Sequence, residues 1–192
     1  MDYAHARRAM VDNQLRPQAV TDPLVIAAMA SVPREQFVPA AMQPVAYVDR
    51  TLDLGDGKWL APPATVGRML TEIEARPGER ALVIGTAPAY VAAVLAQMGL
   101  STNLLADGNL ADGLAGGGPY DIIILDGLVE FVPDAIIAQL RDGGRLGTCL
   151  IENGVPRLVV GRRSGAGFGT RSIADAAAGP IPGFERPRAF VF

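Results

Sequence analysis

Short apolar runs alternate with helical patterns in the second half of the chain. Residues 122–125 are apolar at every position between Asp121 and Asp126, which is typical of a central strand covered on both faces. The alternation is the βαβ rhythm of a parallel sheet, and the glycine-rich tail predicts hairpins that add an antiparallel edge. The predicted strands are 81–84, 102–106, 122–125, 145–150, 157–163 and 189–192, with helices at 90–98 and 133–140 between them.

The first 78 residues have a different pattern and predict a helical arm with a lid. Apolar side chains at helical spacing predict a helix over 3–15 that ends before Pro17. Thr21-Asp22-Pro23 reads as a cap and an early proline that open a second helix through Met29. A third helix is predicted over 64–75. The segment 47–57 between them is predicted to be loop.

The interval between the second and third predicted strands is short. Only 18 residues separate Leu100 from Pro119, and they include the glycines at 113, 116, 117 and 118. A parallel crossover needs about 10–12 residues beyond the strands it joins. The interval is therefore expected to hold one strand and a loop, so that the sheet lacks one strand-helix unit on this side.

Length and composition narrow the class of protein. A chain of 192 residues can bury one sizeable core, so we expect one domain, 1–192, with an arm and lid (1–78) and a core (79–192). We expect a cytoplasmic protein without a membrane segment, because no apolar run is long enough and no signal sequence begins the chain. The net charge of −3 argues against nucleic acid. Because His5 is the only histidine, a metal site is not expected. The single cysteine, Cys149, is expected to be buried.

The turn after the first predicted strand is the first candidate for a ligand site. In an open parallel sheet, ligands bind beyond the carboxyl ends of the strands, where the strand order reverses. Here Gly85 begins a turn into a helix, but Pro88 removes one backbone donor and no dinucleotide glycine fingerprint is present, which argues against a nicotinamide oxidoreductase. Asp107 follows Gly85 by 22 residues, a spacing suited to a ribose ligand, although Asp107-Gly108 is also an ordinary turn dipeptide.

Several segments together resemble one family, the protein-L-isoaspartate O-methyltransferases. They follow the family's order over most of residues 1–150. In the arm they are VPREQFVP at 32–39, AYVDR at 46–50, GDG at 55–57 and Pro62-Pro63. In the core they are Gly85-Thr86, Tyr90, AAVLA at 92–96, PYDII at 119–123, QL at 139–140 and GGRL at 143–146.

The resemblance implies a fold, a reaction and a site. The fold is an α/β Rossmann-like methyltransferase sheet with a helical N-terminal arm. The reaction is methyl transfer from S-adenosylmethionine to the carboxylate of an isoaspartyl protein or peptide, or of a related acceptor, and it depends on positioning rather than on a strong base. The implied cofactor-binding residues are Gly85, Thr86, Ala87, Tyr90, Asp107, Gly108 and Asp126, and the implied substrate-binding residues are Trp59, Leu60 and Ala61.

The chain departs from the family pattern at this implied site. The family's Thr-Ile-Ser segment has a serine that contacts the reacting centre, and Ala61, which we match to it, has no hydroxyl; no catalytic residue is assigned. Val83 replaces an acidic residue, and Ala87 and Ala89 replace glycines. Two interpretations therefore stay open: an active carboxyl methyltransferase, and a non-catalytic descendant that acts as a binding module. Trp59 either stacks on a ligand or fills the gap left by the missing unit.

Overall fold

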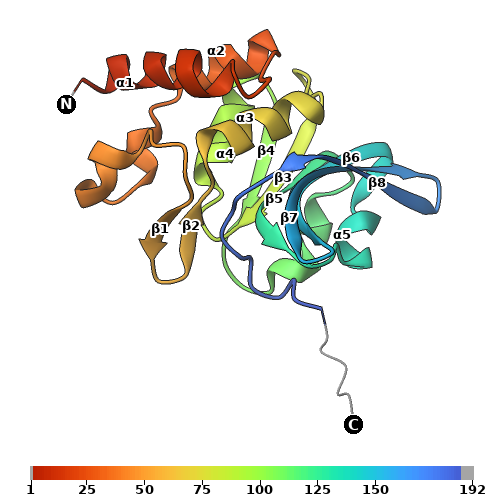
Figure 1. Ribbon diagram of the computed structural model, residues 1–192. Coiled ribbons are helices and arrows are strands. Elements are labelled where there is room, and N and C mark those ends of the chain that lie inside the picture. Colours follow the sequence, from red (N-terminus) through yellow and green to blue (C-terminus); the bar gives the residue numbers. More distant parts are fainter. Residues whose placement is uncertain (1, 187–192) are drawn as a thin grey trace.

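The protein is built around one six-stranded sheet. The computed structural model describes residues 2–186, and the strand predicted at 189–192 lies outside them. The strand order is β4-β3-β5-β6-β7-β8 (Figure 1). The bounds are β3 Arg80–Gly85, β4 Ser101–Leu105, β5 Tyr120–Val129, β6 Leu140–Glu152, β7 Val155–Ser164 and β8 Gly167–Asp175.

The strand directions agree with the prediction from the sequence. β3 pairs in parallel with β4 and β5, and β5 pairs in parallel with β6. β6, β7 and β8 then follow one another as antiparallel hairpins. The mostly parallel sheet with an antiparallel C-terminal edge is therefore confirmed.

Two hydrophobic clusters cover the two faces of the sheet. Alternate residues of each strand point to opposite faces, so Val83 and Ile124 belong to one cluster and Ile84 and Leu125 to the other. Helices α3 (Pro63–Glu72) and α4 (Ala89–Gln97) contribute to the first cluster, and α5 (Asp134–Ala138) contributes to the second. Cys149 is buried as expected, and burial raises the pKa of its thiol to about 12.

The arm is helical, as predicted, with one difference. It contains α1 (Tyr3–Met10), which continues as the π-helical turn η1 (Val11–Leu15), then α2 (Pro23–Ser31) and the 3₁₀ turns η2 (Arg34–Phe37) and η3 (Ala40–Val45). Asp22 caps α2 by accepting from the Leu24 backbone N–H at 2.8 Å, and Pro23 follows it as the first residue of the helix, as the sequence predicted. The segment predicted as loop instead ends in a hairpin, β1 (Leu52–Gly55) and β2 (Lys58–Leu60), because Gly55-Asp56-Gly57 forms its turn.

The short middle of the chain contains one strand and a loop, as predicted. After β4, the chain makes two 3₁₀ turns, η4 (Leu110–Asp112) and η5 (Ala115–Gly117), and enters β5 without a helix. The Gln139 side chain holds this loop: its Nε2 donates to the Asp112 carbonyl and its Oε1 accepts from the Leu114 N–H, both at 2.7 Å. β4 is therefore an edge strand of the sheet.

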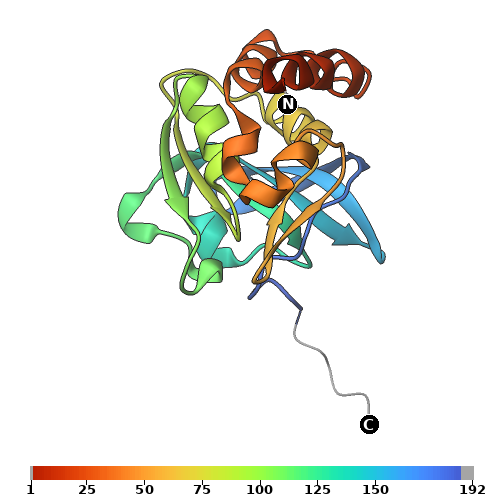
Figure 2. The ribbon, with the colours of Figure 1, turned by 90° about the vertical axis from the view of Figure 1, so that its left-hand side faces the viewer.

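The remaining described segment, 176–186, follows β8 and returns across the sheet. In Figures 1 and 2 it passes between the β1–β2 hairpin and the end of the sheet. One parallel bridge, Leu128↔Pro180, joins it to β5. Within residues 2–186, no helix is long and apolar enough to cross a membrane.

Candidate functional site

Two of the predicted cofactor residues, Gly85 and Asp126, lie side by side where β3 ends. Gly85 is the last residue of β3, and it pairs with Asp126 of β5. A Cβ at Gly85 would lie 2.8 Å from the Asp126 carbonyl oxygen, so the close approach of the two strands requires glycine here. Packing within the protein is thus sufficient to explain why residue 85 is glycine. The carboxyl end of β3 lies between β4 and β5.

The turn after Gly85 contacts the lid, which is the part of the N-terminal region that contains the β1–β2 hairpin. The Thr86 hydroxyl oxygen accepts from the Trp59 backbone N–H at 3.0 Å, which ties the turn to β2. Ala87 lines a cavity of about 440 Å³ together with Phe37 and Lys58. The cationic side chain of Lys58 therefore lines a cavity that the turn after β3 also lines.

Asp107 and Gly108 lie in the turn after β4. Both are exposed, and Gly108 has a φ of +84°, a conformation that glycine adopts readily. A Cβ at Gly108 would meet no atom within 4 Å. The Asp107 side chain is thus exposed, and the backbone at Gly108 has the geometry of an ordinary turn.

A buried polar cluster lies beneath the turn. Tyr90, at the start of α4, is fully buried, and the Arg34 guanidinium carbon lies 4.7 Å from its ring centroid. Three buried polar atoms here have no partner within residues 2–186: Arg34 Nη1, Tyr90 Oη and Asp126 Oδ2. Burial raises the pKa of Asp126 to about 7, with the positive charge of Arg34 acting in the opposite direction. Burial also raises the pKa of Tyr90.

Arg34 connects this cluster to the lid. It is fully buried, and it donates from Nε to the Ala46 carbonyl at 2.7 Å and from Nη2 to the Ala61 carbonyl at 2.6 Å. Burial lowers its pKa. Sequence reasoning did not identify Arg34 as part of the site, because nothing in the segment 32–39 shows that the arginine is buried.

The predicted substrate residues form the end of the lid. Leu60 and Ala61 are buried, and neither has a hydroxyl. The Trp59 side chain is half-buried, and it packs on the backbone of Gly179, where a Cβ would lie 2.0 Å from the indole Cγ. Trp59 therefore contacts the segment after β8, which neither interpretation of this residue anticipated.

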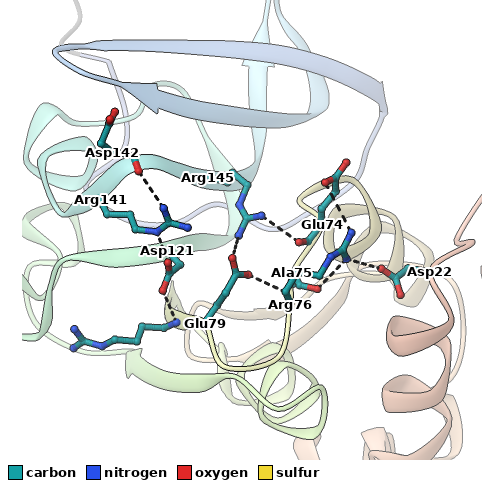
Figure 3. Close-up of polar contacts among 10 residues, drawn as sticks. Asp22, Glu74, Ala75, Arg76, Glu79, Asp121, Arg141, Asp142 and Arg145 are labelled. Atoms are coloured by element: carbon teal, nitrogen blue, oxygen red, sulfur yellow. Dashed lines mark hydrogen bonds and ion pairs between the residues drawn. The ribbon is translucent and has the colours of Figure 1, made fainter.

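Charged side chains gather at the opposite end of the strands. Figure 3 shows Asp121 of β5 and Glu79 before β3 bound to arginine side chains of β6. Asp121 also accepts from the Arg80 backbone N–H, and Glu79 accepts from the Arg76 backbone N–H. Arg145 binds Glu79 and donates to the Glu74 carbonyl, and Arg141 binds Asp121. These charges neutralise one another, so this end has the character of a structural ion-pair network. No group of three side chains that could hold a metal occurs among residues 2–186.

Comparison with known proteins identifies the family. The model of the protein-L-isoaspartate(D-aspartate) O-methyltransferase family matches residues 5–105 and 99–167. The two matches meet in β4, directly before the shortened connection, as a missing segment at this point would produce. Similar proteins include the protein-L-isoaspartate O-methyltransferase of Methylorubrum extorquens, which is 35% identical (76% of this chain, 74% of that protein). That of Koribacter versatilis is 32% identical (81% and 80%).

A solved structure supports the fold. The crystal structure of a putative protein-L-isoaspartate O-methyltransferase from Plasmodium falciparum, in complex with S-adenosyl-L-homocysteine, has a TM-score of 0.77. It is 14% identical, and the likeness covers 92% of this chain and 98% of that one. A further solved protein-L-isoaspartate O-methyltransferase also has a TM-score of 0.77 and covers 93% of this chain. From its sequence and its fold, the chain belongs to the protein-L-isoaspartate O-methyltransferase family.

Proposed function

We propose that this protein is an S-adenosylmethionine-dependent carboxyl methyltransferase that acts on isoaspartyl proteins or peptides in the cytoplasm. The overall reaction converts the isoaspartyl carboxylate into its methyl ester. A carboxylate is already nucleophilic, so the protein must orient two reactants and exclude water rather than supply a strong base. Family membership over most of the chain is the observation that supports this proposal, and the comparisons do not favour a non-catalytic module.

The proposed cofactor groove follows the carboxyl ends of β4, β3 and β5. Its residues come from the end of β3 and the turn after it, the start of α4, the turn after β4, and the position in β5 that pairs with Gly85. They are Gly85, Thr86, Ala87, Tyr90, Asp107, Gly108 and Asp126. The unpartnered polar atoms of Tyr90 and Asp126 lie beneath this groove and favour a polar ligand.

In the arrangement described here, however, these residues do not fit S-adenosylmethionine. The segment around Gly179 lies directly beyond Gly85 and touches Trp59. Four cavities of 310–470 Å³ among the described residues have neither Gly85 nor Asp126 in their walls. The proposed reaction therefore requires the groove to open.

The acceptor is proposed to bind on the lid side, near Trp59, Leu60 and Ala61. Lys58 lines the cavity of about 440 Å³ beside Ala87, and its side chain is exposed. An ammonium group there would attract the acceptor carboxylate electrostatically. We propose that Lys58 contributes to acceptor binding.

The experiment incubates the protein with an isoaspartyl peptide and methyl-labelled S-adenosylmethionine, and it measures labelled methanol released from the ester. The same peptide with ordinary aspartate is the control substrate. Label released only from the isoaspartyl peptide is expected. Absence of release from the wild type, and from the variant Ile181→Ser with Phe184→Ser that is designed to free the groove, would contradict the proposed function.

A substitution tests the acceptor site in the same assay. Lys58→Met should raise KM for the peptide by about fivefold, because an exposed ion pair contributes up to about 1 kcal/mol, while kcat stays nearly constant. Arg50→Met, which removes an exposed charge outside that cavity wall, is the matched control. Equal effects of the two substitutions would exclude a specific role for Lys58.

A further inference from the structure

The segment 176–186, which we call the strap, binds the same edge of β5 as β3 does, beyond the point where β3 ends. β5 has two edges, and near its end β6 occupies one of them through Leu128↔Cys149 and Val129↔Leu150. β3 occupies the other edge, but only as far as Gly85. Beyond that point the Leu128 N–H donates to the Gly179 carbonyl at 2.7 Å, and the Ile181 N–H donates to the Leu128 carbonyl at 3.0 Å. The strap therefore takes the place directly beyond the carboxyl end of β3.

Two side chains anchor the strap. Ile181 and Phe184 are 2% and 1% exposed, and both belong to the hydrophobic cluster that contains Leu82 and Ile84 of β3. A Cβ on Gly127 would lie 2.5 Å from Ile181 Cγ1, so β5 has space for this anchor only because it has glycine here. Burial of two apolar side chains gives the strap a defined position.

The strap touches the walls on both sides of the proposed groove. Gly179 lies against the Trp59 indole on the lid side. At the other end, a Cβ on Gly183 would lie 3.7 Å from Ala111 Cβ and 3.9 Å from Asn109 Oδ1, in the loop that follows Asp107 and Gly108. The strap thus spans the edge of the sheet from the lid to the turn after β4 (Figures 1 and 2).

We propose that the strap is an autoinhibitory segment that fills the cofactor groove, so that S-adenosylmethionine binds only after the strap leaves β5. This inference rests on the proposed function, because it takes the groove beyond Gly85 as the cofactor site. The two occupants exclude each other, since both need the space between Trp59 and the turn after β4. The apparent affinity for the cofactor is then the intrinsic affinity multiplied by the fraction of molecules in which the strap has left β5.

The contacts of the strap favour a segment that detaches without unfolding the sheet. It forms one bridge with β5 rather than a ladder. Between and beyond the two anchors, Pro180, Pro182, Gly183 and Glu185 are exposed. At its end, the Glu130 N–H donates to the Phe184 carbonyl at 3.0 Å, and the exposed Arg186 donates from its backbone N–H and from Nε to Glu130, both at 2.9 Å. Few buried side chains and short hydrogen-bonded runs characterise segments that open locally.

Calorimetric titration with S-adenosylhomocysteine tests the proposal. The variant Ile181→Ser with Phe184→Ser removes both anchors and should bind at least about tenfold more tightly than the wild type. The matched control, Pro182→Ser, changes an exposed side chain of the same strap and should bind like the wild type. Circular dichroism checks that each variant keeps the wild-type fold.

The outcomes separate the strap from the function. Equal, tight binding by wild type and both variants would overturn the autoinhibitory strap and leave the proposed function in place. Absence of binding by all of them at millimolar ligand would overturn both, because opening the groove would have exposed no cofactor site.

Two measurements do not depend on the anchor variant. Trp59, the only tryptophan, touches the strap, so ligand that displaces the strap from the wild type should change the fluorescence of Trp59. The variant Ala111→Cys with Gly183→Cys should lock the strap, because the 3.7 Å between the two Cβ positions lies in the disulfide range of about 3.5–4.5 Å. Gly183 has a φ of +87°, and the resulting strain is present in both redox states, so the reduced variant is the control. Binding by the reduced form and none by the oxidised form is expected; equal binding would contradict the proposal.

Discussion

Arg34 is a fully buried cation whose main hydrogen-bond partners are two carbonyls, those of Ala46 and Ala61. The substitution Arg34→Met should lower the free energy of unfolding by about 3 kcal/mol, because it leaves both buried carbonyls without donors. Arg16→Met is the matched control. Arg16 pairs with Asp12 in an ion pair whose side chains are 60% and 67% exposed, and its loss should change stability by less than about 0.5 kcal/mol. Urea denaturation measures both, and similar losses would contradict the role assigned to Arg34.

Asp126 should make stability depend on pH. Burial raises the pKa of this carboxyl to about 7 in the folded protein, against an ordinary value of 3.8. Between these values the folded state binds more protons than the unfolded state. Stability from this group is therefore fully present below about pH 4 and is lost as the pH rises toward about 7.

The substitution Asp126→Asn isolates this contribution. Asparagine has similar shape and no charge, so the decline in stability between about pH 4 and pH 7 should be smaller in the variant than in the wild type. The urea midpoints of both proteins across this range give the comparison. Only the difference between them is informative, because other groups also titrate: backbone and Arg141 hydrogen bonds lower the pKa of Asp121 despite its burial. Parallel pH profiles would exclude the assignment to Asp126.

Among the elements, the β7–β8 hairpin offers a matched pair of glycines. A Cβ at Gly161 of β7 would lie 2.2 Å from the Phe168 ring, whereas a Cβ at Gly169 of β8 would meet no atom within 4 Å. Gly161→Ala should lower the free energy of unfolding by about 1–3 kcal/mol, because the ring must move. Gly169→Ala should be neutral or slightly stabilising, because alanine restricts the unfolded chain. Thermal unfolding compares the two, and a loss of stability in Gly169→Ala alone would show that the packing argument is wrong.

Among the elements, the sequence predicted correctly those features that follow from hydrophobic periodicity and from the length of the intervals between strands. The continuous apolar run of β5 and the short interval after Leu100 were sufficient to predict a covered central strand and a missing unit, because both depend on local composition and chain length. The β1–β2 hairpin was not predicted. Its strands are only four and three residues long, too short for a visible alternation.

The candidate site was predicted only in part, for a physical reason. Gly85 ends β3 and pairs with Asp126, as neighbours in the predicted sheet should, but β5 continues beyond Asp126 to Val129, whereas the predicted strand ended at residue 125. The burial of Arg34 and the contact of Gly179 with Trp59 were missed. Both depend on tertiary contacts between segments far apart in the chain, and no local pattern reports such contacts.

For the molecule as a whole, one hydrophobic cluster joins the arm to the sheet. Leu15 and Met29 of the arm belong to the same buried cluster as Val83 and Leu158 of the sheet. At Gly67 of α3, a Cβ would lie 3.2 Å from Leu15 and 3.2 Å from Met29, so the arm packs closely on this helix. We propose that arm and core form a single domain that unfolds in one transition.

Scanning calorimetry tests this proposal. One peak is expected, with equal calorimetric and van't Hoff enthalpies. Met29→Ala empties a fully buried position of the arm, and it should move the whole peak down by roughly 5–15 °C, since such a cavity costs about 2–5 kcal/mol in a chain of this size. If the arm were a separate unit, the substitution would instead move one small peak and leave the unfolding of the sheet unchanged. The shared cluster argues for the first result, because a cavity beneath the arm also removes contacts from the residues that cover β3.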